Sequence, residues 1–290
     1  MFEDQELAKE LADKGYQFSS ANSINIGRLV PQVAYYVYAY TKLLANGEIK
    51  DGEKINVVVP TGNFGNILAA YYAKNLGVPI AKLICASNDN KVLYDFFQTG
   101  TYDKNREFVL TTSPSMDILI SSNLERLIYL ICGEDSEKTK ELMEELKTTG
   151  KYTITPEMKE KLADFAAGYS TEEETAESIH DTYQKTGYVM DTHTAVAAHV
   201  CGQYRAKSGD QTKCVIASTA SPYKFVKSVM SAIDAENANA DEFDLLPKLQ
   251  EVSGVPMPQA IKDILDAKVL HDLECDAGKM KDTVKGILGV

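Results

Sequence analysis

The sequence predicts an α/β protein with a parallel sheet flanked by helices, and three neighbouring segments carry that prediction. Residues 55–60 form a largely β-branched apolar run, which is typical of a strand buried on both faces. A turn containing Gly62 and Gly65 follows, and then an Ala-, Leu- and Tyr-rich helix that ends at Gly77. A second apolar strand at residues 80–86 completes a βαβ unit, whose right-handed crossover makes its two strands parallel.

The remaining segments extend this sheet domain. Residues 31–44 are apolar almost all round, which predicts a buried helix whose tyrosines belong to the core or a subunit interface rather than to a ligand site. A helix at 191–202 precedes a third buried strand at 213–217. We predict a helical insertion at about 91–188 and a helical tail at about 237–290. Within the insertion, helices are expected at 124–130, 141–147, 156–167 and 171–185.

Composition limits the class of partner. The net charge is −12 and no run of Lys and Arg occurs, so we exclude nucleic acid and an anionic membrane and expect a small-molecule substrate. No apolar stretch approaches the roughly 18 residues that a membrane span needs. The N-terminus is acidic and amphipathic, and it lacks the basic start and apolar run of a signal peptide.

The cysteines and histidines indicate the compartment and exclude a metal. The chain has 5 widely spaced cysteines, which fit neither a disulfide framework nor a zinc site and indicate a reducing, cytoplasmic location. The 4 histidines are scattered without the spacing of metal ligands, so no metal site is predicted.

The glycine turn after the first strand is the predicted binding site. Backbone N–H groups at a helix start lack intrahelical acceptors, and Gly62 and Gly65 have no Cβ that would keep an anion at a distance. The turn has no lysine, which excludes a Walker A loop, and two glycines supply donors for one phosphate rather than a pyrophosphate. Two alternatives stay open, a purely structural turn and a dinucleotide site in which Asp89 binds a ribose.

Several motifs together resemble threonine synthase, a fold-type II pyridoxal-phosphate enzyme with the tryptophan synthase β-like fold. Their combination, in family order and over nearly all 290 residues, carries the resemblance. It implies that residues 1–290 are part of the catalytic α/β domain of such an enzyme, namely its C-terminal portion. The motifs are Ser20–Asn25, Gly62–Asn66, Ser113–Asp117 with Ser121–Arg126, and Asp191–Ala195.

The resemblance implies a site for pyridoxal 5′-phosphate. The hydroxyl of Thr219, at the carboxyl end of the third strand, would face the pyridine nitrogen, and a neutral hydroxyl does not hold that nitrogen protonated as a carboxylate does. The alternative for Ser218 and Thr219 is that they cap the helix that follows. The residues expected around the cofactor phosphate are Thr61, Gly62, Asn63, Phe64, Gly65 and Asn66.

Candidate substrate contacts lie in two other segments. Asn22, Ser23 and Asn25 are expected at the floor of the active site, although an Asx turn would explain them equally. Ser20, Asn22 and Asn25 are expected to bind the substrate. Arg28 and Lys224 are the cations expected to meet a substrate phosphate, with solvated surface charge as the alternative. His193 and Thr194 are open to interpretation as a simple helix cap.

The lysine that the family links covalently to the cofactor aldehyde has no counterpart in this sequence. We expect it upstream of Met1, in an N-terminal portion of the same enzyme or in a separate chain, and we expect no turnover by this chain alone. The resemblance implies conversion of O-phospho-L-homoserine and water to L-threonine and phosphate. The alternatives are another fold-type II lyase, such as a hydroxyamino-acid dehydratase, and a noncatalytic module for phosphate-ligand binding or assembly.

Overall fold

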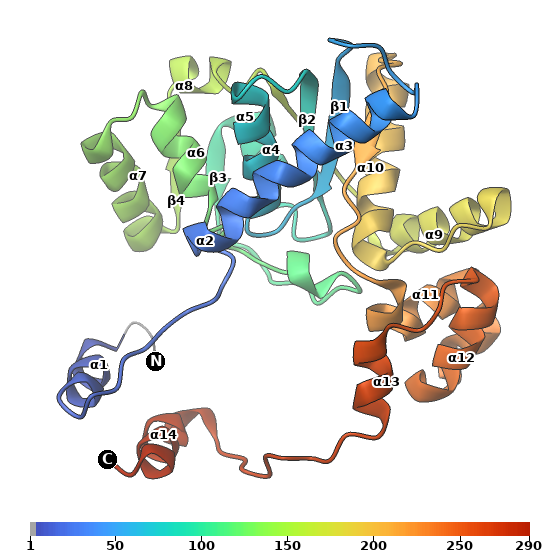
Figure 1. The fold of residues 1–290 in the computed structure, drawn as a ribbon. Helices are drawn as coiled ribbons and strands as arrows, with labels where there is room; N and C mark the ends of the chain where they lie inside the picture. Colours follow the sequence, from blue (N-terminus) through green and yellow to red (C-terminus); the bar gives the residue numbers. More distant parts are fainter. Residues whose placement is uncertain (1–3) are drawn as a thin grey trace.

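A computed structural model describes residues 4–290, and residues 1–3, the first of the acidic N-terminal segment, lie outside the described part. The described residues form a four-stranded sheet in the order β5-β2-β1-β6, and every neighbouring pair is parallel. The predicted parallel α/β architecture is therefore confirmed (Figure 1). The strands are β1 (Ile55–Pro60), β2 (Ile80–Ser87), β5 (Phe165–Tyr169) and β6 (Cys214–Ile216).

Helices cover both faces of this sheet. Side chains alternate along a strand, and accordingly Val57 and Val59 pack in the core cluster that contains α4 (Gly65–Asn75), whereas Val58 packs with Val196 of α10 (Thr192–Ser208). All six residues of β1 are buried. The central strand is apolar at consecutive positions because each of its two faces packs against a helix.

The segment at 91–188 is not purely helical. The helix predicted at 156–167 is wrong in its second half, because α8 ends early and residues 165–169 form β5, paired with β2 from Leu83↔Phe165 onward. That pairing joins residues far apart in sequence, so no local pattern reports it. The other elements here are α5 (Val92–Thr99), β3 (Thr101–Asp103), η2 (Pro114–Met116), α6 (Leu124–Ile131), α7 (Ser136–Thr149), β4 (Lys151–Thr153), α8 (Pro156–Glu160) and α9 (Glu172–Thr186).

The helix predicted at 31–44 is α3 (Val33–Ala45), which follows α2 (Ile26–Leu29) and η1 (Val30–Gln32). It is buried on one face only, so the prediction of all-round burial is wrong. Tyr36 and Tyr40 lie in the core, whereas Tyr35 is 58% and Tyr38 63% exposed. The sequence shows that both faces are apolar but not which of them meets the sheet domain.

The C-terminal part contains two structural units. Leu245 of α12 and Val229 of α11 pack with Ile179 of α9 in a second apolar cluster. The last helix lies beside α1 near both chain ends (Figure 1), where Lys285 pairs with Glu10 at 2.5 Å. The elements are α1 (Gln5–Ala12), η3 (Pro222–Phe225), α11 (Val226–Ile233), η4 (Ala235–Asn239), α12 (Glu242–Ser253), α13 (Gln259–Leu265), η5 (Ala277–Lys279) and α14 (Met280–Leu288).

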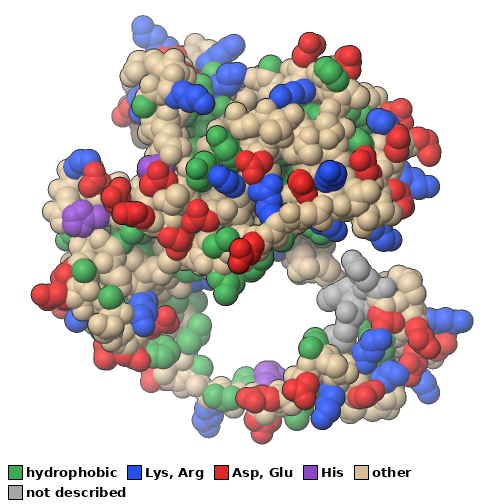
Figure 2. Space-filling model, turned by 180° about the vertical axis from the view of Figure 1, so that it is seen from behind, with side chains coloured by type: hydrophobic (Ala, Val, Ile, Leu, Met, Phe, Trp, Pro, Cys, Tyr) green, Lys and Arg blue, Asp and Glu red, His purple; other side chains and the backbone are tan. Residues whose placement is uncertain are grey.

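The surface agrees with the charge balance of the sequence. On the face shown in Figure 2, Lys and Arg side chains are scattered among Asp and Glu rather than gathered in one patch. Over residues 4–290, the structure has no helix that combines the length and the apolar character needed to cross a membrane.

Candidate functional site

An open cleft of about 1280 Å³ lies at the carboxyl end of β1 and β6. Its walls come from the loop between β1 and α4, the segment after β6, the start of α3 and the turn η2. Ligands of open parallel α/β sheets bind outside the carboxyl ends of the strands. The cleft therefore occupies the position that the fold offers for a ligand.

The loop after β1 turns through a left-handed residue. Phe64 has φ 65°, and it stands before α4 with no side chain capping the helix. Its ring is 1% exposed and packs against Phe97 and Phe165, at centroid distances of 6.2 and 6.1 Å. The buried ring holds a conformation that a non-glycine residue rarely adopts. Within residues 4–290, the backbone N–H groups of residues 62–67 have no hydrogen-bond acceptor.

The carbonyl groups of residues 62–64 are engaged, that of Phe64 by the N–H of residue 68 in α4. The Ser121 hydroxyl donates to the Gly62 carbonyl at 2.7 Å, and Asn123 donates to the Asn63 carbonyl from its backbone N–H at 3.1 Å and its side-chain amide at 2.9 Å. The Ser122 hydroxyl donates to the Asn63 side chain at 3.2 Å. Because the acceptors are paired and the donors are not, the loop presents N–H groups and a helix N-terminus, which together favour an anion.

Packing requires Gly62 and leaves little room for a side chain at Gly65. A Cβ on Gly62 would lie 2.5 Å from the carbonyl oxygen of Ser115, and one on Gly65 would lie 3.3 Å from the Asn123 side-chain nitrogen. Neither glycine has a positive φ. The sequence argument explained both by access of an anion to the backbone, and the structure adds that the loop lies directly on the segment 113–123.

The first turn of α4 is tied to α3. The Tyr36 hydroxyl donates to the Asn66 side-chain oxygen, and the Asn66 amide donates to Gln32 at 3.0 Å. Burial raises the pKa of Tyr36 well above its usual value, so it remains a neutral donor. The Asn66 side chain is therefore satisfied within the protein. Its backbone N–H is the part that stays available to a ligand.

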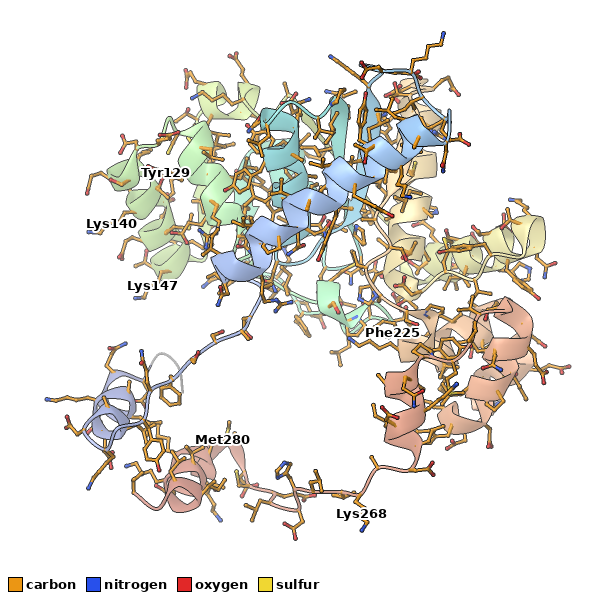
Figure 3. All side chains as sticks on the ribbon, viewed as in Figure 1. Tyr129, Lys140, Lys147, Phe225, Lys268 and Met280 are labelled. Carbon is orange, nitrogen blue, oxygen red and sulfur yellow. The ribbon has the colours of Figure 1, made fainter. Side chains whose placement is uncertain are left out.

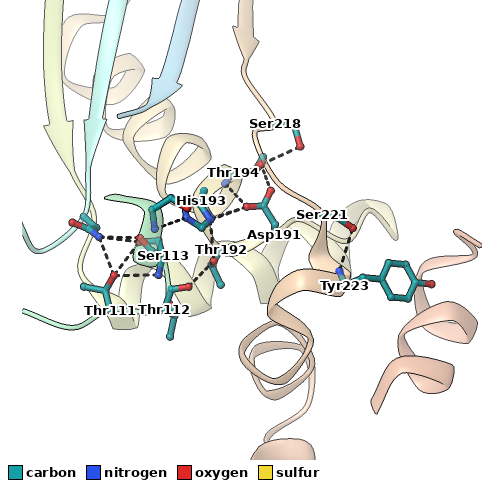
Figure 4. Close-up of polar contacts among 12 residues, drawn as sticks. Thr111, Thr112, Ser113, Asp191, Thr192, His193, Thr194, Ser218, Ser221 and Tyr223 are labelled. Carbon is teal, nitrogen blue, oxygen red and sulfur yellow. Dashed lines mark hydrogen bonds and ion pairs between the residues drawn. The ribbon is translucent and has the colours of Figure 1, made fainter. Parts of the chain in front are cut away.

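The opposite wall is built around the start of α10. Asp191 caps this helix, accepting from the backbone N–H of His193 at 2.9 Å and of Thr194 at 3.3 Å (Figure 4). Burial raises the pKa of Asp191, but hydrogen bonds from His193 and Thr194 outweigh it and the pKa is lowered overall. The interpretation of His193 and Thr194 as the cap is wrong, because the side chain of Asp191 performs it.

His193 faces the cleft and was missed as a wall residue. Its Nδ1 lies 3.2 Å from Asp191 Oδ1, and its Nε2 accepts the backbone N–H of Ser115 at 3.3 Å. The ring packs on Phe225, labelled in Figure 3, at a centroid distance of 4.8 Å. The carboxylate beside Nδ1 and the N–H donor at Nε2 fix the orientation of the imidazole ring.

Thr219 lines the cleft, together with Ser218. Among residues 4–290, no partner is found for the Thr219 hydroxyl. The alternative that Ser218 or Thr219 caps the next helix is wrong, because Ser221 does so by accepting from the N–H of Tyr223 at 3.3 Å. A hydroxyl at the mouth of the cleft is thus available to a ligand.

Comparisons with known proteins agree on one family. Residues 194–281 match the family model described as Threonine synthase, C-terminal. The chain is 43% identical over 259 residues to Threonine synthase-like 1 of Pongo abelii, over 88% of this chain and 34% of that protein. It is 36% identical over 290 residues to threonine synthase of Saccharomyces cerevisiae, over 94% of this chain and 56% of that one. The family model and the relatives agree that the chain is similar to threonine synthases over most of its length.

Solved threonine synthases share its fold. The yeast enzyme superposes with a TM-score of 0.80 at 32% identity, over 98% of this chain and 57% of that chain. A threonine synthase from Brucella melitensis, described as bound to PLP, gives 0.75 at 35% identity, over 99% of this chain and 55% of that one. The predicted fold-type II architecture is confirmed. The chain spans about a third to somewhat more than half of the length of these relatives.

The predicted substrate residues divide into two groups. Asn22, Arg28 and Lys224 line the cleft, whereas Ser20 and Asn25 are not among its lining residues within the described chain. The Asn25 side-chain oxygen caps α2 by accepting from the N–H of Gly27 at 2.8 Å, and the Asn25 amide donates to the Ser20 carbonyl at 3.2 Å. Arg28 donates to the Ala21 carbonyl at 2.7 Å. An Asx-type turn therefore exists there, beside the cleft.

The dinucleotide alternative can be compared with the structure. Asp89, proposed for a ribose, accepts instead from the N–H of Glu172 at 3.2 Å at the start of α9 and is not a cleft residue among those described. The dinucleotide alternative thus loses the residue on which it rested. Residues 4–290 contain no group of three or more His, Cys, Asp and Glu placed to hold a metal ion.

Proposed function

We propose that this chain forms the cofactor-phosphate side of a threonine synthase active site that binds pyridoxal 5′-phosphate. The observation that carries the proposal is the run of acceptor-free N–H groups at residues 62–67, at a helix start inside the cleft. A related protein from Brucella melitensis is described as PLP bound, which supports the same cofactor here. The complete enzyme would convert O-phospho-L-homoserine and water to L-threonine and phosphate.

The residues present fit this cofactor by their chemistry. The backbone N–H groups of residues 62–66 would hold the phosphate, and Thr219 would meet the ring nitrogen with its hydroxyl. The Thr61 hydroxyl donates to the Val59 carbonyl at 2.7 Å and its N–H to the Ala86 carbonyl at 2.8 Å, so Thr61 would lie beside the phosphate without donating to it. When bound, pyridoxal phosphate supplies an electron sink for carbanions formed from an amino acid. A neutral hydroxyl at the ring nitrogen makes that sink milder than a carboxylate would.

The substrate phosphate would bind at the cationic edge of the cleft. Arg28 and Lys224 both line the cleft, and the net charge of −12 makes such local cations necessary for binding an anion. The Lys224 ammonium lies 5.4 Å from the centre of the Phe225 ring, which limits its positions. Asn22 and, through their local turn, Ser20 and Asn25 would complete the floor.

We propose further that the lysine linked to the cofactor aldehyde comes from an N-terminal portion of the enzyme outside this chain. Among the described residues, Lys224 is the lysine that lines the cleft, and we assign it a phosphate-binding role. The five cysteines are free, which supports a cytoplasmic location. Borohydride reduction in the presence of pyridoxal phosphate, followed by peptide mass spectrometry, tests the assignment. A phosphopyridoxyl group on Lys224 would contradict it.

The cofactor proposal is tested by titrating the chain with pyridoxal phosphate and following absorbance and fluorescence. We expect saturable binding, and at least about tenfold weaker binding by Gly65→Leu, since a larger side chain meets Asn123 beside the loop. Gly202→Ala is the matched control, because a Cβ there has no neighbour within 4 Å. Unchanged affinity of Gly65→Leu would remove the loop from the site.

Activity separates the candidate functions. Phosphate release from O-phospho-L-homoserine should appear only when the chain is mixed with the N-terminal portion of a related threonine synthase. Release by the chain alone would contradict the external lysine. Cofactor binding without release in the mixture would favour the noncatalytic module, and ammonia release from L-threonine would favour a dehydratase.

A further inference from the structure

One buried carboxylate is connected to both walls of the cleft. Asp191 is 1% exposed, and its two oxygens have different partners (Figure 4). Oδ1 lies 3.2 Å from Nδ1 of His193, and Oδ2 accepts the hydroxyl of Thr194. A helix cap needs only one carboxylate oxygen. The contacts of Asp191 with the His193 ring and with the Thr194 hydroxyl are therefore not needed to cap α10.

The first connection reaches the segment after β6. Thr194 Oγ1 lies 3.1 Å from the Ser218 hydroxyl oxygen. The Thr194 hydroxyl is the donor in both contacts, and its one proton is shared between Asp191 Oδ2 and Ser218 Oγ. The contact holds the Ser218 side chain beside Thr194, and Ser218 is directly followed by Thr219, the proposed partner of the ring nitrogen.

The second connection reaches the phosphate loop. His193 Nε2 accepts the N–H of Ser115 at 3.3 Å, and the Ser115 carbonyl is the group closest to the missing Cβ of Gly62, at 2.5 Å. The Thr192 hydroxyl, from the same helix start, donates to the Thr112 carbonyl at 2.8 Å. The start of α10 therefore holds the turn on which the phosphate loop rests.

We infer that Asp191 is a positioning residue for the cleft, holding the Ser218–Thr219 segment through Thr194 and the Ser115 turn under Gly62 through His193. Both walls then keep the spacing that one rigid ligand needs. The identity of that ligand rests on the proposed function, whereas the coupling of the two walls does not.

The test separates positioning from folding. Thr194→Val keeps the branched shape but removes the hydroxyl, and we expect about tenfold weaker pyridoxal phosphate binding with a shifted absorbance of the bound cofactor. Thr194→Ser should restore both to within about twofold. Asp241→Asn is the matched control, because Asp241 caps α12 by accepting from the N–H of Phe243 at 2.9 Å, outside the cleft.

Hydrogen exchange of the ligand-free protein provides a second readout. In Asp191→Asn and Thr194→Val, backbone amides of residues 217–220 should exchange faster, and in Asp191→Asn those of 113–117 as well. Unchanged exchange in both segments, or a Thr194→Val protein that binds the cofactor like wild type, would overturn the inference. If wild type binds no pyridoxal phosphate, the proposed function fails, and the exchange experiment still decides the positioning role.

Discussion

Gly62→Ala is the substitution whose effect follows most directly from the structure. The added Cβ would lie 2.5 Å from the Ser115 carbonyl oxygen, 3.2 Å from the Met116 Cα and 3.5 Å from the Ser115 carbonyl carbon. All three are backbone atoms, so no side chain can rotate away. The turn is fixed by hydrogen bonds from Met116 N–H to the Ser113 carbonyl at 2.9 Å and from Ser115 N–H to His193.

The expected cost is that of overpacking a fixed contact, about 1–3 kcal/mol of unfolding free energy. For a chain of this size, 1 kcal/mol corresponds to roughly 2–4 °C in Tm. Relief of the clash moves the loop whose N–H groups would hold the phosphate, and each 1.4 kcal/mol of lost binding is about tenfold in Kd. We therefore expect Kd for pyridoxal phosphate to rise at least about tenfold.

The assay combines urea unfolding with a spectroscopic titration of pyridoxal phosphate. Gly202→Ala is the control, because it places the same methyl group on α10 where nothing lies within 4 Å, and alanine favours a helix over glycine by about 1 kcal/mol. The control should be as stable as wild type or more so. If Gly62→Ala matched wild type in both stability and affinity, the close packing of the loop on the Ser115 turn would be refuted.

Three further predictions concern other parts of the chain. Asn123→Ala removes both side-chain amide bonds that hold the Asn63 carbonyl and the 20–25 segment, so unfolding free energy should fall by about 1–3 kcal/mol and cofactor affinity should fall with it, as measured by urea unfolding and titration. Hydrogen bonds lower the pKa of Asp210 from its usual 3.8, so its stabilisation is present above that pH and is lost as pH falls below it. Asp210→Asn should accordingly be less stable than wild type at pH 7 and approach it at low pH, and a constant difference would contradict this. A hydrogen bond from the Cys201 thiol lowers the pKa of Cys214, whereas burial raises the pKa of Cys85 to about 12. Iodoacetamide should therefore label Cys214 far faster than Cys85, as measured by mass spectrometry.

The central βαβ unit could be predicted because its signals are local. A strand that is buried on both faces must be apolar at consecutive positions, and residues 55–60 meet that condition. The glycine loop could also be predicted as an N–H-rich helix start, since Phe64 and the residues after it leave their amides without acceptors within the described chain. The strand at 165–169 could not be predicted, because its pairing with Leu83 depends on a distant segment.

The sequence by itself determined the class of fold, the central βαβ unit and the loop at which an anion would bind, because hydrophobic periodicity, glycine and helix-start chemistry act between near neighbours in the chain. Only the tertiary structure decided which polar side chains meet. Asp191 reaches Ser218 and Ser115 through Thr194 and His193, and Asn123 reaches Asn63 across 60 positions. Such contacts form because packing brings separate segments within hydrogen-bond distance, and no local pattern in the sequence records that distance.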